Sequence, residues 1–201
     1  MQYLKDEVRK NIVEEALIEF KQRGYKDTSI RSIAKNSKTS VGNFYKYYHG
    51  KGDLYENLIN PVYDKLMDYI NRFDEVSVSE KTDDIFYELM EKILEIFKES
   101  STELTILLNK SEGSKYENCK KDFVDFTTKI VSQRMEYELS LQGKKLKNNF
   151  IIYLISYNLV ESISIILREK EDGIEVRKFI LDIIDIFYSN IISKLDYENI
   201  K

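Results

Sequence analysis

The scarcity of residues that interrupt helices is the strongest constraint on what this chain can fold into. Its 201 residues include one proline and seven glycines. Because proline removes a backbone donor and glycine frees the backbone, both residues mark helix ends and turns, and so few of them leave long uninterrupted helices. Hydrophobic residues make up 42% of the chain, which is enough to bury a core. We therefore expect an all-α fold of about nine helices.

The cysteine content and the first residues bear on the compartment. Cys119 has no second cysteine with which to form an intramolecular disulfide, and the segment MQYLKDEVRK lacks the apolar core of a secretory signal. Residues 150–167 are the most apolar stretch, but serines, Asn158 and Glu161 interrupt it, whereas a membrane span needs roughly 20 mostly apolar residues. We expect a cytoplasmic protein with no membrane partner, a buried helix over residues 150–167 and a buried Cys119 thiol.

Charge is distributed unevenly along the chain. The whole chain has a net charge of −4, yet residues 1–52 carry +5 and the remainder carries −9. Between Thr28 and Gly52 there are five basic residues and no aspartate or glutamate. Such a segment suits a surface that approaches phosphates. On charge alone, a solvated basic face is the alternative.

Helical periodicity divides the N-terminal part into short helices. Apolar residues recur at helical spacing over residues 5–23, which predicts an amphipathic first helix that ends at Gly24. A second helix is expected over residues 29–36, with Thr28 or Ser29 as its cap, and a third from residue 39 or 40 to residue 47. Two helices joined by a turn of a few residues form a helix-turn-helix, whose second helix enters the major groove of DNA.

The same segment carries a recognisable pattern in a fixed order. Its members are Thr28-Ser29, Ile33-Ala34, Ser40, Gly42, Phe44-Tyr45, Tyr47-Tyr48, Lys51 and Leu54. In these residues the chain resembles the DNA-binding signature of the TetR family of transcriptional regulators, over roughly its first quarter. The resemblance implies a helix-turn-helix domain in residues 1–52, followed by a larger helical domain in residues 53–201 that binds a small-molecule effector and dimerises.

Two positions depart from the family pattern. The family commonly has glycine in the turn and an aliphatic residue after it, whereas this chain has Lys38 and Thr39. If Lys38 adopts the left-handed conformation, the side chain costs about 1 kcal/mol relative to glycine.

The predicted third helix supplies most of the candidate DNA contacts. Asn43 is the best candidate for base readout, because its amide can donate and accept at the adenine edge, and Val41 suits a thymine methyl group. Tyrosine hydroxyls and Lys51, at the start of the fourth helix, suit the sugar-phosphate backbone. The resemblance gives Arg31 a contact with a base or a phosphate. The full predicted set is Arg31, Thr39, Ser40, Val41, Gly42, Asn43, Tyr45, Lys46, Tyr47 and Lys51, with Phe44 and Tyr48 expected in the core.

Longer helices are expected in the rest of the chain. Their predicted ranges are residues 53–73, with a kink at Pro61, and residues 82–99, 102–110, 115–141, 146–169 and 174–197. The last two carry apolar residues over more than one face, which indicates contact on two sides. A second copy of the chain is the expected partner, through a two-fold four-helix interface, and packing within one chain is the alternative.

Aromatic and polar side chains of these helices suggest an effector site. The predicted apolar lining is Phe86, Met90, Phe97, Phe123 and Phe126, and the predicted hydrogen-bonding groups are Tyr153, Tyr157, Asn158 and Glu161. Such a pocket suits an aromatic or amphipathic ligand, or a cationic one if Glu161 is ionised. The alternative is that the polar group bonds across the dimer interface.

Taken together, the residues favour a DNA-binding regulator, a repressor that a small-molecule effector releases from double-stranded operator DNA. The sequence shows no glycine-rich phosphate loop, no metal-ligand spacing and no nucleophile with a plausible base, so we expect no catalytic residues, metal site or cofactor. His49, the only histidine, is expected in an exposed loop. The competing interpretation is a helical protein-interaction module that does not bind DNA.

Overall fold

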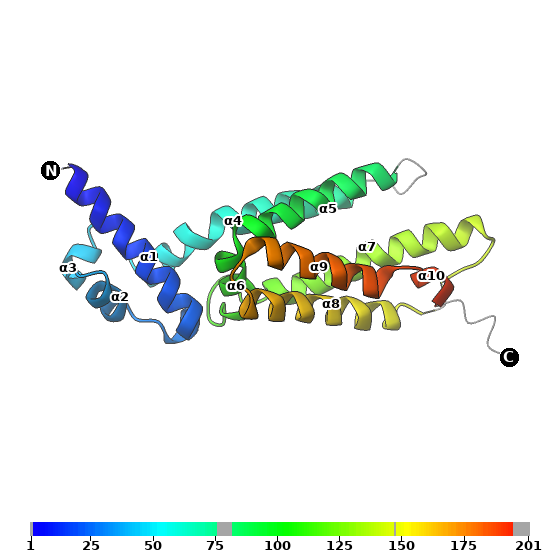
Figure 1. Cartoon of the computed structure of the whole chain (residues 1–201). Coiled ribbons are helices and arrows are strands. Elements are labelled where there is room, and N and C mark those ends of the chain that lie inside the picture. The colour runs from blue at the N-terminus through cyan, green and yellow to red at the C-terminus, as the bar shows by residue number, and fades with distance from the viewer. Residues whose placement is uncertain (1, 76–81, 147, 195–201) are drawn as a thin grey trace. The chain divides into compact units, whose positions relative to one another are not determined.

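The chain is helical throughout the part that the structure describes. The computed structural model describes the backbone of residues 2–75, 82–146 and 148–194, and the side chains of residues 5–72, 88, 90–146, 148–191 and 194. Within these residues there are helices, turns and bends but no strands (Figure 1). The helices are α1 (Gln2–Asp27), α2 (Ile30–Asn36), α3 (Val41–Phe44), α4 (Lys51–Glu75), α5 (Thr82–Glu99), α6 (Ser101–Asn109), α7 (Cys119–Leu141), α8 (Phe150–Glu169), α9 (Gly173–Tyr188) and α10 (Ile191–Lys194). The predicted all-α fold is confirmed.

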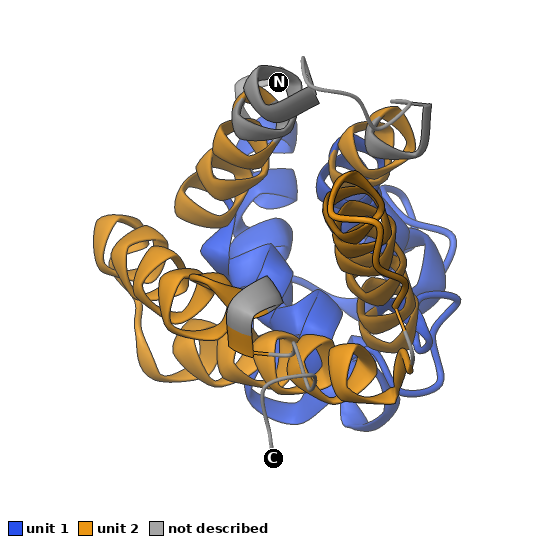
Figure 2. Ribbon diagram, turned by 90° about the vertical axis from the view of Figure 1, so that its right-hand side faces the viewer, with its two compact units in different colours: residues 1–65, 100–119 blue, residues 66–99, 120–201 orange. Residues whose placement is uncertain are grey.

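The chain forms two compact units (Figure 2). The first contains residues 1–65 and 100–119, and the second contains residues 66–99 and 120–201. Helix α4 therefore begins in the first unit and ends in the second. Residues 100–119 belong to the same unit as the N-terminal helices, whereas the domain boundary predicted after residue 52 assigns them to the C-terminal domain. The functional division at residue 52 stays a prediction.

The core of the first unit forms around α1. This helix fully buries Ile12, Ala16 and Phe20 and packs against α2 and α6. At Gly24 the backbone leaves the helical region, with φ 80° and ψ 167°, which confirms the predicted end of the regular first helix. The Thr28 hydroxyl donates to the Gly24 carbonyl at 2.7 Å and so fixes the turn toward α2.

Capping determines where α2 and α3 begin. Ser29 is the N-cap of α2, and its Oγ accepts from the Ser32 amide at 3.1 Å. Ser40 is the N-cap of α3, and its Oγ accepts from the Asn43 amide at 3.1 Å. Both hydroxyls satisfy amides that the first helical turn leaves without a backbone partner.

Helix α3 is shorter than predicted. The prediction of one helix from residue 39 or 40 to residue 47 was wrong, because only Val41–Phe44 is α-helical. Ser40 has an extended backbone, which excludes Thr39 from the helix. After Phe44 the chain makes tighter turns, in which the Lys46 amide donates to the Asn43 carbonyl at 3.1 Å.

The second unit is built on α5, α8 and α9. Helix α9 packs against both α5 and α8. Among the described helices, α8 is the one long and apolar enough to cross a membrane, a test that a core helix also meets. Here α8 packs on α9 and buries Ile152, Val160 and Leu167.

Three predicted helix ends in the C-terminal part were wrong, one of them the start of α8, which lies at Phe150 rather than at residue 146. The last helix does not continue unbroken through residues 174–197, because α9 ends at Tyr188 and Asn190 has φ 56°, a left-handed conformation that asparagine tolerates. Helix α7 begins at Cys119 rather than at residue 115, because the preceding residues form turns. In one of them the Cys119 amide donates to the Tyr116 carbonyl at 3.0 Å.

Candidate nucleic-acid interface and ligand cavity

Hydrogen bonds hold α2 and the following turn on α1. The Asn36 side chain donates to Glu19 Oε1 at 2.9 Å, and Glu19 is itself buried on α1. The Ser37 hydroxyl donates to the Ile33 carbonyl at 2.7 Å, and the Thr39 amide donates to the Ala34 carbonyl at 2.9 Å. The turn that sets the angle between α2 and α3 is therefore fixed by its own backbone.

Residues 40–48, which comprise α3 and the residues that flank it, have an exposed outer side and an inner side that is anchored in the core. Phe44 is fully buried and Tyr48 nearly so, which confirms their predicted place. On the outer side, Val41 is 37% exposed and Tyr45 is 52% exposed. The remaining exposed members of the predicted set are Arg31, Ser40, Gly42 and Lys46.

The backbone at Gly42 is open to close approach. A Cβ atom added at Gly42 would have the Ser40 Oγ, at 4.0 Å, as its nearest neighbour. Beyond the backbone of α3 and the neighbours of Gly42 in the chain, no other atom of the described residues lies within 4 Å of that position, so another molecule can come close to it. The role of Gly42 in letting DNA approach the helix stays a prediction.

Asn43 is held in place by Thr39. Its side-chain nitrogen donates to Thr39 Oγ1 at 2.8 Å, and both residues are half-buried. The contact orients the amide that is the best candidate for reading a base. Thr39, which departs from the family pattern, therefore has a positioning role that the sequence does not predict.

Lys51 makes contacts within its own unit. Its ammonium donates to the Tyr25 carbonyl at 2.6 Å and the Lys26 carbonyl at 3.1 Å, and it lies 4.5 Å from the centre of the Tyr25 ring. Burial lowers the pKa of Lys51. The side chain thus binds carbonyls at the end of α1, so its predicted phosphate contact would cost these hydrogen bonds. Tyr47, also predicted to contact the DNA backbone, is half-buried.

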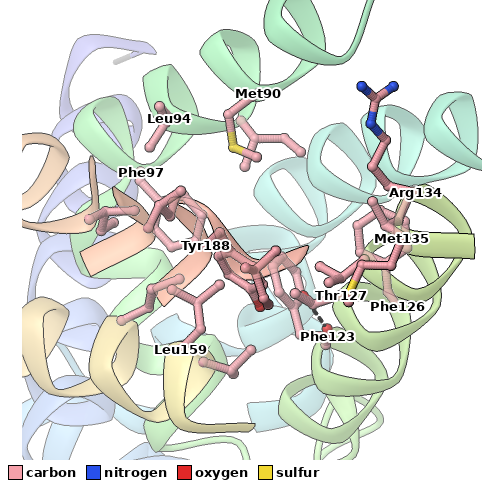
Figure 3. A pocket seen from close by; sticks show the side chains of 18 of the residues that line it. Met90, Leu94, Phe97, Phe123, Phe126, Thr127, Arg134, Met135, Leu159 and Tyr188 are labelled. Carbon is pink, nitrogen blue, oxygen red and sulfur yellow. Dashed lines mark hydrogen bonds between the residues drawn. The ribbon is translucent and has the colours of Figure 1, made fainter. Parts of the chain in front are cut away.

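The second unit contains a cavity of about 730 Å³, lined by residues of α5, α7, α8, α9 and α10 (Figure 3). Four predicted effector residues line it, namely Met90, Phe97, Phe123 and Phe126. Phe86 lies outside the residues whose side chains the structure describes. Four of the five residues of the predicted apolar lining are thus brought together in one place.

The polar half of that site does not line the cavity. Tyr153, Tyr157 and Asn158 are exposed, and Asn158 donates to the Leu154 carbonyl at 2.7 Å. Glu161 forms an ion pair with Lys120 at 2.8 Å. These residues share one face of α8, whereas Leu159, Val160 and Ile163 on another face line the cavity. Their assignment to the effector stays a prediction that the cavity does not support.

Other polar residues line the cavity instead, and sequence analysis missed them. They are Thr127, Arg134, Gln142, Tyr188 and Asn190. The Tyr188 hydroxyl lies 3.4 Å from Ser156 Oγ, and burial raises the pKa of Tyr188. One signal could have revealed Arg134. It follows Phe123, Phe126 and Ile130 at helical spacing, as a lone charge on an apolar face of α7.

Sequence comparison places the N-terminal part among known regulators. Residues 12–58 match the family described as bacterial regulatory proteins, tetR family. YttP of Bacillus subtilis (strain 168), named as an HTH-type transcriptional regulator, is 36% identical over 61 residues, which are 30% of this chain and 30% of YttP. YuxN, from the same strain and also named as an HTH-type transcriptional regulator, is 46% identical over 59 residues, which are 29% of this chain and 20% of YuxN. The chain thus matches less than a third of either relative.

Solved structures resemble the chain over most of its length. The fatty acid degradation regulator FadR from Bacillus halodurans aligns with a TM-score of 0.52 and 14% identity, covering 90% of this chain and 98% of that one. NalD of Pseudomonas aeruginosa, the secondary repressor of a multidrug efflux pump, aligns with a TM-score of 0.50 and 16% identity, covering 91% and 94%. At such identities the likeness establishes the fold. The match to the TetR family of bacterial regulatory proteins is that of residues 12–58, which contain the helix-turn-helix of α2 and α3.

Proposed function

We propose that the chain is a transcriptional regulator that binds double-stranded operator DNA through α2 and α3 and acts in the cytoplasm. The observation that carries this proposal is the exposed outer face of α3, which lies in a segment, residues 28–52, without a single acidic residue. Lysine and arginine side chains in such a segment gain binding energy by displacing counterions from phosphates. The names of both Bacillus subtilis relatives agree with this function.

Within this interface the residues have different roles. Asn43, oriented by Thr39, reads a base edge, and Val41 contacts a thymine methyl group. The hydroxyl of Tyr45 and the cations of Arg31 and Lys46 contact the sugar-phosphate backbone. Ser40 caps the helix, and Gly42 lets it approach closely.

A homodimer would supply two such interfaces. Helices α8 and α9 pack side by side (Figure 1) and leave large apolar side chains uncovered, with Phe150 62% exposed and Ile186 63% exposed. Tyr153, Tyr157, Ile165 and Phe179 are exposed on the same two helices. A second copy would cover them in a four-helix interface and fix the distance between two recognition helices.

The cavity supplies the means of regulation. A small molecule that binds it more tightly in one conformation than in another shifts the population toward that conformation. If the two DNA-binding surfaces of the dimer are wrongly spaced for the operator in the favoured conformation, the effector weakens DNA binding. The loss of DNA-binding free energy equals the coupling free energy between the effector site and the DNA site. The regulator is then a repressor that its effector releases.

Selection of duplexes from a random library with the full-length chain tests the proposal. We expect enrichment of a sequence with two half-sites related by two-fold symmetry. Asn43→Ala should weaken binding to the selected duplex by about 1–3 kcal/mol in each half-site, with an unchanged helical circular-dichroism signal. Asn118→Ala is the matched control, because Asn118 is exposed in the same unit but lies outside α2 and α3. Failure to enrich any sequence, or equal effects of the two substitutions, would contradict the proposal.

A further inference from the structure

We propose that the cavity binds an apolar molecule that ends in an acidic group, with the acid held by Arg134 at the edge of the cavity. The inference deepens the proposed function, since it names the chemical class of the effector. It rests on that function only in treating the cavity as the effector site.

The interior of the cavity is lined by apolar side chains and therefore favours an apolar ligand. Its walls include Leu94, Phe97, Val160 and Ile180, each almost completely buried. A polar group placed among them would lose its hydrogen bonds to water without replacement. A hydrocarbon chain or ring system loses nothing there and gains by leaving water.

The charge at the edge of the cavity selects the end group. Among the described residues that line the cavity, Arg134 is the one charged side chain, and it is 29% exposed. Figure 3 shows its guanidinium at the edge of the lining residues, with Phe123 and Tyr188 nearer the centre. A guanidinium presents a planar fork of donors that matches a carboxylate or a phosphate. The cationic ligand considered from the sequence has no such support, because Glu161 pairs with Lys120 away from the cavity.

Glu138 competes for the same cation. It lies one turn after Arg134 on α7, and Arg134 Nη2 donates to its carboxylate. A guanidinium has five N–H donors, so a ligand acid can share it with Glu138 or displace Glu138. Removal of the Glu138 charge should therefore favour an acidic ligand. This gives two neighbouring substitutions with opposite expected effects.

Calorimetric titration of the full-length chain with three probes tests the inference. The probes are dodecanoic acid, dodecyl phosphate and dodecan-1-ol, which share one apolar chain and differ in the end group. We expect at least one of the acids to bind about tenfold more tightly than the alcohol, and the comparison of the two acids identifies the preferred group. Arg134→Gln should remove this advantage and leave alcohol binding unchanged, whereas Glu138→Gln should strengthen binding of the acid a few-fold.

Several results would overturn the inference. They are equal binding of acids and alcohol by the unmodified chain, absence of binding by all three probes, and an Arg134→Gln variant that weakens acid and alcohol alike while keeping its helical signal. Operator binding is measured separately on the same protein. If the chain binds no selected duplex but still prefers the acids to the alcohol, the proposed function is overturned and the ligand class is retained.

Discussion

Lys38 shows how a single residue departs from what its backbone position favours. It lies in the turn between α2 and α3 with φ 54°, a conformation in which a side chain is strained and glycine is not. The resemblance to the TetR family pointed to this position, and the structure confirms the left-handed conformation. The Lys38 side chain is exposed, and within the described residues the turn is held by backbone hydrogen bonds around it.

Lys38→Gly should therefore stabilise the chain. Relief of the strained φ outweighs the extra freedom of glycine in the unfolded state, and we expect a gain of about 0.5–1 kcal/mol in the free energy of unfolding. Lys35→Gly is the control, because Lys35 is an exposed residue inside α2, where glycine should cost about 1 kcal/mol. Urea denaturation followed by circular dichroism measures both. Equal destabilisation by the two substitutions would show that the turn does not strain Lys38.

Tyr55 links burial to the pH dependence of stability. Its ring is buried edge-on to the rings of Phe20 and Tyr25, and its hydroxyl shares a hydrogen bond of 3.0 Å with Ser111. Burial raises the pKa of Tyr55 to about 12. In the unfolded chain a tyrosine ionises near pH 10, so between these values the unfolded state loses its proton first. Stability that Tyr55 contributes at neutral pH is therefore lost as the pH rises from about 10 to about 12.

Tyr55→Phe should make the alkaline loss of stability shallower. The substitution removes one hydrogen bond, which costs about 1 kcal/mol at pH 7, but it also removes about 2 kcal/mol of the fall between pH 10 and 12. Thermal or urea unfolding at several pH values gives both quantities. An unchanged slope above pH 10 would mean that Tyr55 does not titrate differently in the folded and unfolded chain.

At the scale of helices, periodicity predicted the elements better than their ends. The bounds of α5 agree with the predicted range of 82–99, because its apolar stripe is strong and its ends are polar. The end of α9 was missed because Asn190 lies in an apolar pattern that continues helically, and only its backbone conformation breaks the helix. The prediction of the cavity lining was limited in the same way, because periodicity alone does not give the orientation of a helix. Periodicity placed Phe123 and Phe126 together, but it could not say which face of α8 turns toward them.

The start of α9 depends on a glycine whose role no sequence pattern reveals. A Cβ atom added at Gly173 would lie 2.0 Å from the Lys98 carbonyl oxygen, at the end of α5. Because this neighbour is backbone, no side-chain rotation can relieve the clash. The close packing of α5 on α9, which forms part of the cavity wall, thus requires a residue without a side chain.

Gly173→Ala should destabilise the second unit. Overpacking of this kind costs about 2 kcal/mol or more, and we expect a lower unfolding midpoint together with weaker binding of cavity ligands. Gly50→Ala provides the comparison, since a Cβ atom at Gly50 meets nothing within 4 Å. Equal unfolding midpoints for the two alanine variants would contradict a clash at Gly173.

At the scale of the whole molecule, the uneven charge and the uncovered apolar face have one explanation. The N-terminal 52 residues carry +5 and the rest −9, so attraction to a polyanion is confined to one part of the chain. The apolar side chains left uncovered on α8 and α9 belong to the other part. A dimer that covers these side chains and presents two basic surfaces accounts for both features. Sequence predicted this division of roles, because charge and hydrophobic periodicity are properties of the sequence itself.

The salt dependence of operator binding tests the central claim most directly. The logarithm of the affinity for the selected duplex should fall linearly with the logarithm of salt concentration, and Lys46→Gln should reduce the slope by about one for each protomer. Lys178→Gln, at an exposed position on α9, should leave the slope unchanged. A salt-independent affinity, or a slope that Lys46→Gln does not alter, would contradict the assignment of α3 and the turn after it as the DNA-binding surface.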